Sequence, residues 1–152
     1  MSRKQLNKSE IRELNSELIE YGFSFDAKDK IEIFKEGYEI LMSNNTLMFF
    51  RFENRWAPTL KLILERNFLK KIVVDMGAVR FVVSGADIMR PGVVEIDEGI
   101  SSGDFVAVAD VNNKKPLAVG IALFSADQMR RMEKGKVIKN IHFVGDKLWN
   151  SF

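Results

Sequence analysis

The chain has 152 residues, of which 46% are hydrophobic and 29% charged, and it contains no cysteine. A chain of this size can bury a core as one domain or two small ones, while the missing cysteine excludes disulfide bonds and thiolate metal sites. The charged N-terminus MSRKQLNKSE lacks the apolar segment of a signal peptide, and no apolar run approaches the roughly 18 residues that span a bilayer. We therefore expect a cytoplasmic protein with no membrane partner.

The net charge of +2 conceals an uneven distribution along the chain. Residues 72–113 carry two basic and seven acidic side chains, a net charge of −5, whereas residues 114–147 carry eight basic and three acidic ones, a net charge of +5. A basic C-terminal third is compatible with phosphate binding. The same charges are typical of a solvated helix and loop ends, so this feature alone does not predict a ligand.

The first element is an amphipathic helix predicted over residues 7–22. Asn7 and Glu10 form a capping-box pattern, and Gly22 stands where a helix commonly ends. Apolar residues spaced by three and four define the face that enters the core: Ile11, Leu14, Leu18 and Tyr21.

Strands follow this helix. Residues 38–42 and 47–52 predict a hairpin around Asn44 and Asn45, because asparagine tolerates positive φ. The next segment, WAPTLKLILERNF, predicts a second helix with Pro58 in its first turn.

The aromatic residues of this region have two interpretations. Phe49, Phe50, Phe52 and Trp56 would suit a platform for stacking bases. Alternating strand residues beside an amphipathic helix are more simply a core, so we expect Phe50 and Phe52 to be buried and leave Trp56 open.

Beyond residue 70 the pattern changes to short apolar strands, at residues 72–75, 105–111, 117–123 and 137–143. Ser125 and Gln128 form a second capping-box pattern, which predicts a short helix over residues 125–134 that ends at Gly135. Many short strands separated by glycine turns indicate a small, closed or nearly closed barrel.

The segment 77–94, GAVRFVVSGADIMRPGVV, is ambiguous on its own. Val79, Phe81 and Val83 alternate as in a strand, whereas Ala78, Phe81 and Val82 are spaced as in a helix. The β-branched residues favour the strand only weakly.

Longer motifs carry a resemblance. The stretches VDMGAVRFVVSGADIMRPGV, SADQMRRMEKG and IKNIHFVGDKLW resemble a PUA domain, the RNA-binding module of pseudouridine synthases and archaeosine transglycosylases. With LMFFRF and PTLKLIL added, the chain resembles the malignant T-cell-amplified-sequence family of translation-associated proteins, from about residue 30 to residue 149. Archaeal members of that family place a pre-PUA domain before the PUA domain.

This resemblance implies an α+β fold, with a pre-PUA α/β domain over residues 1–70 and a PUA pseudo-barrel of about six strands over residues 71–152. It also implies that residues 78–84 are helical and that Gly85 takes the left-handed conformation after the helix. Related proteins often carry an Asn-Asp-Gly turn before Leu-Trp. Here Gly145, Asp146 and Lys147 stand in its place, so the geometry of this turn is left open.

The resemblance further implies an RNA-contacting surface along that helix, the loop and strand after it, and the last strand. The residues at these positions are Arg80, Gly85, Ala86, Asp87, Met89, Arg90, Pro91, Gly92, Lys136 and His142. We expect Arg90 to be exposed and to be the main charged contact. Core packing is the simpler expectation for Met89, and turn geometry explains the glycines as well as ligand contact does.

Reactive chemistry is scarce in this sequence. His142 is the only histidine and has no cysteine partner or evident catalytic triad. The acidic stretch EIDEGISSGD lacks the ligand spacing of a calcium loop. We therefore expect no catalysis, no metal and no organic cofactor.

The resemblance implies binding of structured RNA, either the tRNA acceptor end or small-subunit rRNA, in initiation, re-initiation or recycling on the small ribosomal subunit. An initiation-factor-like protein of the SUI type would dock on the N-terminal domain. Two alternatives remain: an accessory subunit for RNA modification or ribosome biogenesis, and a protein-interaction adaptor without RNA affinity. Convergence of Arg80, Arg90, Lys136 and Lys139 on one face would favour RNA, whereas scattered cations and an apolar patch on the first domain would favour the adaptor.

Overall fold

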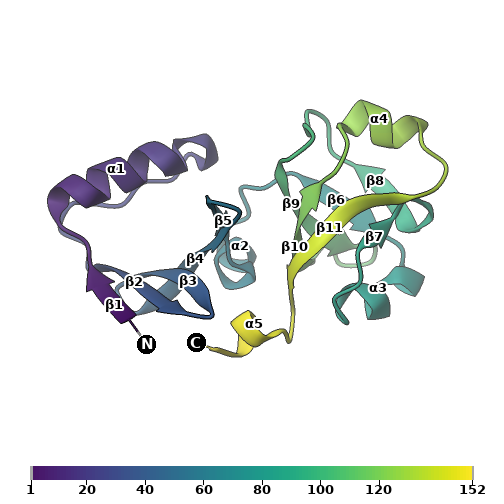
Figure 1. The fold of residues 1–152 in the computed structure, drawn as a ribbon. Helices are drawn as coiled ribbons and strands as arrows, with labels where there is room; N and C mark the ends of the chain where they lie inside the picture. The colour runs from purple at the N-terminus through teal and green to yellow at the C-terminus, as the bar shows by residue number, and fades with distance from the viewer. Residues whose placement is uncertain (1, 152) are drawn as a thin grey trace.

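The computed structural model describes residues 2–151. A five-stranded sheet from the N-terminal half lies beside a six-stranded sheet from the C-terminal half, and short helices pack against both (Figure 1). The predicted α+β fold and the barrel-like sheet of about six strands are confirmed. Among the described helices, none is both long enough and apolar enough to cross a membrane.

The N-terminal module is an antiparallel sheet in the order β1-β2-β3-β4-β5. Its elements are β1 (Ser2–Gln5), α1 (Lys8–Leu18), the 3-10 helix η1 (Ile19–Tyr21), β2 (Ile31–Glu36), β3 (Tyr38–Ser43), β4 (Thr46–Phe52), β5 (Arg55–Pro58) and α2 (Leu60–Glu65). The capping box of Asn7 and Glu10 is present at the start of α1, and Gly22 follows η1 with φ of +65°. The predicted first helix is thus confirmed, with its last turn tightened to 3-10 geometry.

The predicted hairpin is also confirmed, because β3 and β4 pair around Asn44 and Asn45, whose φ values are +49° and +68°. The prediction for Pro58 is wrong. Pro58 ends the edge strand β5. The outer side of this strand has no neighbour among the described strands, so the missing backbone N–H of proline breaks no hydrogen bond of the sheet there. Helix α2 begins at Leu60, two residues later, and the side chain of its N-cap residue Thr59 accepts a hydrogen bond from the Leu62 N–H.

The aromatic residues of the N-terminal module form a core rather than a platform. Phe49 and Phe50 are fully buried in two different clusters, and Phe52 packs half-buried against the cluster that contains Phe50. Trp56 is also buried, and its indole N–H donates to a Glu17 carboxylate oxygen at 3.1 Å. The core interpretation of Phe50 is confirmed, and Trp56 joins it.

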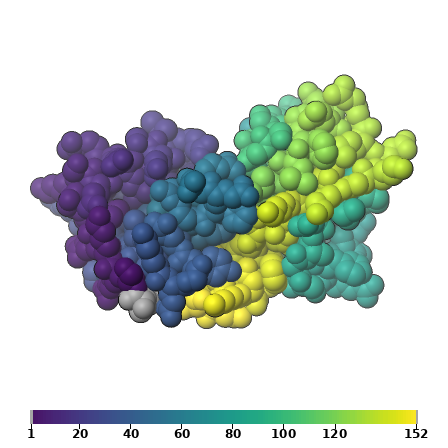
Figure 2. Space-filling model, viewed as in Figure 1, coloured from purple at the N-terminus to yellow at the C-terminus, as the bar shows by residue number. Residues whose placement is uncertain are grey.

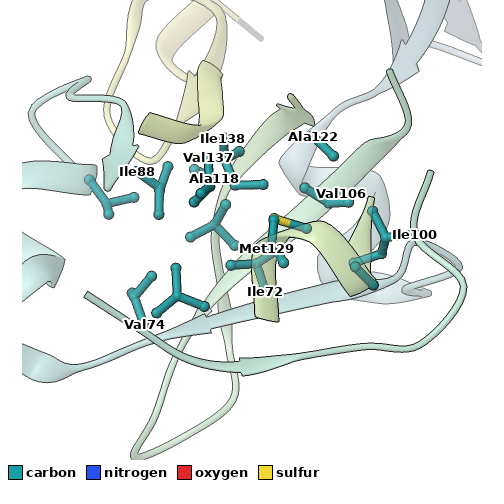
Figure 3. Packing of buried hydrophobic residues seen from close by; sticks show 14 residues of the cluster. Ile72, Val74, Ile88, Ile100, Val106, Ala118, Ala122, Met129, Val137 and Ile138 are labelled. Atoms are coloured by element: carbon teal, nitrogen blue, oxygen red, sulfur yellow. The ribbon is translucent and has the colours of Figure 1, made fainter. Parts of the chain in front are cut away.

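The C-terminal module is a six-stranded sheet in the order β7-β11-β10-β9-β6-β8, in which only β6 and β9 pair in parallel among the described strands. Its elements are β6 (Lys71–Val74), α3 (Met76–Val82), β7 (Ile88–Met89), the 3-10 helix η2 (Arg90–Gly92), β8 (Val93–Ile96), β9 (Phe105–Asp110), β10 (Pro116–Ala122), α4 (Ala126–Arg131), β11 (Lys136–Phe143) and α5 (Lys147–Ser151). Side chains from several strands and from Met129 of α4 point toward one another and form a core between the curved sheet and α4 (Figure 3).

Helix α4 begins as predicted but ends early. Ser125 and Gln128 make the expected capping box. The chain leaves the helix at Met132, which is extended, so Gly135 does not end it. Gly135 instead has φ of +97° in the loop that leads into β11.

The ambiguous segment forms a helix followed by a left-handed glycine, as the resemblance implied. The Asp75 side chain caps α3 by accepting from the Ala78 N–H at 2.9 Å. Gly85 has φ of +93°, and a Cβ there would lie 2.9 Å from the Phe143 ring. Conformation and space therefore both require glycine at this position.

One hydrophobic cluster joins the two modules. It combines Phe50, Leu60 and Ile63 with Phe105 and Ile121 of β9 and β10. The Arg55 guanidinium donates to the Gly103 carbonyl at 2.7 Å and stacks 4.1 Å from the centre of the Phe105 ring. The C-terminal segment lies against the N-terminal half in Figure 2. The division near residue 70 into separable domains stays a prediction, since the core runs across it.

Candidate nucleic-acid interface

A surface groove of about 370 Å³ lies between α3 and the edge strand β7. Its lining is almost entirely apolar and consists of Gly77, Ala78, Phe81, Val82, Ala86, Asp87, Ile88, Met89 and Gly92. We call these nine residues the α3–β7 groove. Five of the residues named as RNA contacts from the sequence either line this groove or shape its bend: Gly85, Ala86, Asp87, Met89 and Gly92.

Large apolar side chains of this region are exposed instead of buried. Phe81 is 53% exposed and Met89 is 49% exposed, and both line the groove. Met76, at the start of α3, is exposed as well. The expectation that Met89 packs in the core is wrong, because β7 lies at the sheet edge and turns this side chain outward. Clustered apolar exposure of this kind is typical of a binding surface.

Each wall of the groove carries a cation. The exposed Arg80 of α3 places its guanidinium 4.7 Å from the centre of the Phe81 ring. Lys136 stands on β11 directly across from Met89 of β7, and it is also exposed. An elongated anion with flat apolar groups would find both kinds of contact here.

Asp87 holds Lys136 at the edge of the groove. Its Oδ2 accepts from the Lys136 Nζ at 2.9 Å, and its Oδ1 accepts from the Asn140 backbone N–H at 2.9 Å. Partial burial raises the pKa of Asp87, but the hydrogen bonds from Lys136 and Asn140 outweigh burial, and the net effect lowers this pKa. Asp87 is therefore ionised at neutral pH.

Glycine at position 92 permits close packing beside the groove. A Cβ at Gly92 would lie 3.3 Å from the Ala78 Cβ, so a side chain there would push η2 away from α3. The Gly92 carbonyl accepts from the Asp75 N–H at 2.9 Å, which fixes this approach. The neighbouring Pro91 is exposed.

Arg90 does not belong to the exposed surface, so that expectation is wrong. Its Nε donates to the Met129 carbonyl at 2.6 Å, and its Nη1 donates to the Val93 carbonyl at 3.0 Å. Met129 lies in the last turn of α4, and its carbonyl also accepts from the Met132 N–H at 3.1 Å. The half-buried guanidinium adds a second donor to this carbonyl and ties α4 to η2 and β8.

His142 is likewise not a surface contact. It is 1% exposed, its Nδ1 lies 2.8 Å from an Asp146 carboxylate oxygen, and its ring meets Phe50 edge-on at 5.3 Å. Strand alternation turns His142 toward Phe50 at the junction of the modules, where the ring is buried. The turn left open by the sequence is now defined, with Gly145 at φ of +90° and Asp146 capping α5 through the Trp149 N–H.

Sequence analysis missed Phe81, the most exposed large apolar side chain of the groove lining. The available signal was an aromatic residue on the same helical face as Gly77 and Ala78, where small residues leave the ring uncovered. Lys139, by contrast, turns away and lies 5.2 Å from the centre of the Phe52 ring in the N-terminal module. The four cations named for convergence therefore do not share one face, since only Arg80 and Lys136 stand beside the groove. The divided cations and the exposed Ile19 of the N-terminal module are the pattern that favours the adaptor alternative, whereas the groove itself favours RNA.

Among residues 2–151, no three His, Cys, Asp or Glu side chains lie close enough to hold a metal ion. What this part of the chain presents at the groove is apolar contact and two cations. Such a surface can bind and orient a ligand.

Comparison with protein families identifies both halves of the chain. Residues 70–144 match the family described as the PUA domain, and residues 2–66 match a family described as a domain of unknown function, DUF1947. The match over residues 70–144 covers every element of the α3–β7 groove and both of its flanking cations.

Individual relatives match between 72% and 95% of this chain. The chain is 40% identical to protein MJ1432 of Methanocaldococcus jannaschii, over 95% of this chain and 93% of that protein. It is 38% identical to malignant T-cell-amplified sequence 1-A of Xenopus laevis, over 81% and 72%. It is 31% identical to translation machinery-associated protein 20 of Schizosaccharomyces pombe, over 72% and 64%.

Solved structures agree. A crystal structure of protein PH0734.1 from Pyrococcus horikoshii is 34% identical and superposes with a TM-score of 0.83, over 97% of this chain and 98% of that one. A chain in the structure of an H/ACA RNP bound to a substrate RNA is 26% identical with a TM-score of 0.52, over 63% of this chain and 29% of that one.

Proposed function

The chain belongs to the family of the malignant T-cell-amplified-sequence proteins and translation machinery-associated protein 20, and from this we propose that it is a translation-associated protein that binds RNA without catalysis. The observation that carries the proposal is the α3–β7 groove, an exposed apolar channel with a cation on each wall. RNA combines flat apolar bases with regularly spaced phosphates, which matches both features.

Unpaired nucleotides fit the groove better than a duplex. An A-form helix hides the faces of its bases, whereas loops and ends present them for stacking on aromatic side chains. The half-exposed Phe81 ring and the Met89 side chain supply such contacts, and stacking contributes roughly 1–3 kcal/mol per base. We therefore favour the unpaired acceptor end of tRNA, with an unpaired loop of small-subunit rRNA as the other candidate.

Phosphates would sit on Arg80 and Lys136. In the free protein Lys136 pairs with Asp87, so a phosphate competes with this carboxylate for the ammonium group. Two phosphate contacts imply a weak salt dependence, with a slope of about −1.4 in a plot of log affinity against log salt for a single strand.

The N-terminal module suits a protein partner. Ile19 is 76% exposed and lines a second, largely apolar hollow of about 390 Å³ together with Phe23. We propose that an initiation-factor-like protein of the SUI type docks on this module. The complex would act in the cytoplasm on the small ribosomal subunit, in initiation, re-initiation or recycling.

Binding of deacylated tRNA tests the RNA part of this proposal. We expect Phe81→Ala to weaken binding by roughly 1–2 kcal/mol, because one stacking surface is lost. Ile19→Ala removes an exposed apolar side chain from the other module and serves as the control. We also expect tRNA without its unpaired 3′ nucleotides to bind more weakly than intact tRNA.

Two results would count against the proposal. Equal binding by Phe81→Ala and the parent protein would exclude the groove as the RNA site. No measurable binding of the parent protein to tRNA or to small-subunit rRNA fragments would favour the adaptor alternative.

A further inference from the structure

Asn140 of β11 does not line the α3–β7 groove, yet it holds one of its walls. Its side-chain Nδ2 donates to the Val82 carbonyl at 3.0 Å and to the Ala86 carbonyl at 3.0 Å. Its backbone N–H donates to the Asp87 carboxylate at 2.9 Å. One residue of a different strand thus makes three hydrogen bonds to the bend between α3 and β7.

The carbonyls that Asn140 reaches lie at the end of α3 and in the bend after it. Val82 is the last residue of α3, and its carbonyl accepts from the Gly85 N–H at 3.0 Å as well as from Asn140. Ala86 lies beyond Gly85, in the bend that turns the chain into β7. The amide of Asn140 closes the end of the helix from across the module and fixes where the bend runs.

The orientation of this amide is defined by its surroundings. Both neighbouring groups are carbonyl oxygens, which accept only, so the nitrogen must face them. The Oδ1 is buried and accepts no hydrogen bond from any residue between 2 and 151. An unsatisfied buried acceptor opposes folding. The favourable contribution of this side chain to the fold therefore comes from the two hydrogen bonds that it donates to the bend.

We propose that Asn140 is a positioning residue for RNA binding, which sets the shape of the α3–β7 groove by holding the bend at Val82–Asp87 and touches no RNA itself. This inference rests on the proposed function. Ala86 and Asp87 line the groove, and Asp87 in turn holds Lys136. Release of the bend would therefore misplace an apolar wall and a cation together.

The test uses the full chain, deacylated tRNA and two substitutions. Asn140→Leu removes the donors without adding charge. Asn140→Asp replaces them with a carboxylate beside two carbonyls and Asp87. If the competent bend falls to about a tenth of the population, the Kd for tRNA rises roughly tenfold, and we expect this for both variants at about pH 8. Amide hydrogen exchange at Gly85 and Ala86 should become faster in both.

A conservative rescue separates positioning from general damage. Carbonyls and a neighbouring carboxylate raise the pKa of an aspartate, and its protonated form regains one donor. We expect Asn140→Asp to recover affinity relative to the parent near pH 5.5, while Asn140→Leu does not recover. Asn150→Asp is the matched control, because it carries the same change at an exposed amide that donates to the Gly145 carbonyl before α5 and makes no hydrogen bond to residues 82–87. It should leave the Kd within about twofold.

The outcomes are distinguishable. If the parent protein fails to bind tRNA and rRNA fragments, the proposed function fails on the parent alone. If the parent binds and both Asn140 variants bind equally well, only the positioning role is overturned. Weakened binding with unchanged exchange at Gly85 and Ala86 would also overturn it, because Asn140 would then act by direct contact.

Discussion

Arg90 joins three parts of the C-terminal module through one guanidinium. It extends from η2 to the end of α4 and the start of β8, and both acceptors are backbone carbonyls. Hydrogen bonds from a charged donor to partly buried acceptors stabilise a fold more than an exposed charge does. Its role in this protein is therefore architectural.

We expect Arg90→Ala to lower the free energy of unfolding by roughly 1–3 kcal/mol, because two carbonyls lose a charged donor. Urea denaturation of the purified variant measures this. Arg90→Lys should restore little, since a single ammonium cannot reproduce the fork of two N–H groups.

Arg80 is the matched control on the neighbouring helix. Its side chain is exposed, so Arg80→Ala should leave the unfolding free energy within about 0.5 kcal/mol. It should instead reduce the magnitude of the salt slope of RNA binding by about 0.7, the share of one phosphate contact to a single strand. If the two arginine variants show the reverse pattern, the roles given to these residues are exchanged.

At the scale of elements, the bend after α3 depends on Gly85. A side chain there would need positive φ and would overlap the Phe143 ring. We expect Gly85→Val to lower stability by roughly 2–4 kcal/mol, the sum of a left-handed penalty and overpacking. Thermal unfolding without RNA measures this loss.

Gly145 provides the comparison, because its φ is +90° but no atom lies within 4 Å of an added Cβ. Gly145→Ala should lower stability by only about 1–2 kcal/mol. An equal loss at both positions would show that the Phe143 contact has no effect.

The C-terminal helix α5 depends on an ionised carboxylate. Burial raises the pKa of Asp146, but hydrogen bonds from His142, Trp149 and Phe143 outweigh burial and lower it overall. A carboxyl with a lowered folded pKa stabilises the fold above its unfolded pKa of about 3.9 and loses this contribution as pH falls through the folded value.

We therefore expect Asp146→Asn to be less stable than the parent at neutral pH, and the difference to shrink below about pH 4. Urea denaturation at several pH values gives both quantities. A constant difference over the whole range would mean that the charge of Asp146 does not contribute.

Local patterns predicted some elements and not others, for physical reasons. Asn7 and Ser125 find their capping partners three residues away, so the sequence alone identifies both helix starts. The acceptors of Arg90 include the carbonyl of Met129, 39 residues away. Only the tertiary fold brings them together, and no local pattern signals that Arg90 is engaged. His142 was misassigned to the RNA surface because alternation does not say which face of a strand meets the other module.

At the scale of the whole molecule, the junction between the two modules is packed like a hydrophobic core. Strand β9 is buried on both faces: Val106 and Val108 point into the pseudo-barrel, while Phe105 and Ala107 point toward the N-terminal module. The chain also passes residue 70 inside the sheet, with the Lys70 carbonyl accepting from the Ala107 N–H at 2.9 Å. The boundary near residue 70 thus lies at the ordered start of strand β6.

We expect the intact chain to unfold in one cooperative transition. A fragment that begins at Lys71 should melt at a lower temperature, because it exposes the apolar outer face of β9 and β10. Calorimetry of both proteins tests this, and limited proteolysis should find residues 66–72 resistant in the intact chain. Two separate transitions, or a fragment as stable as the parent, would instead show that the modules fold independently.

The pairing of β7 with β11 also has a consequence for synthesis on the ribosome. Helix α3 and β7 end by Met89, but β7 has β11 as its only neighbour in the described sheet, and β11 begins at Lys136. At roughly 5–20 residues per second, the segment that completes the groove is made several seconds after the groove's own walls. A nascent chain therefore carries the apolar residues of the groove without its shape. We expect it to acquire RNA affinity only once β11 has left the exit tunnel, so that unfinished copies do not compete with finished ones.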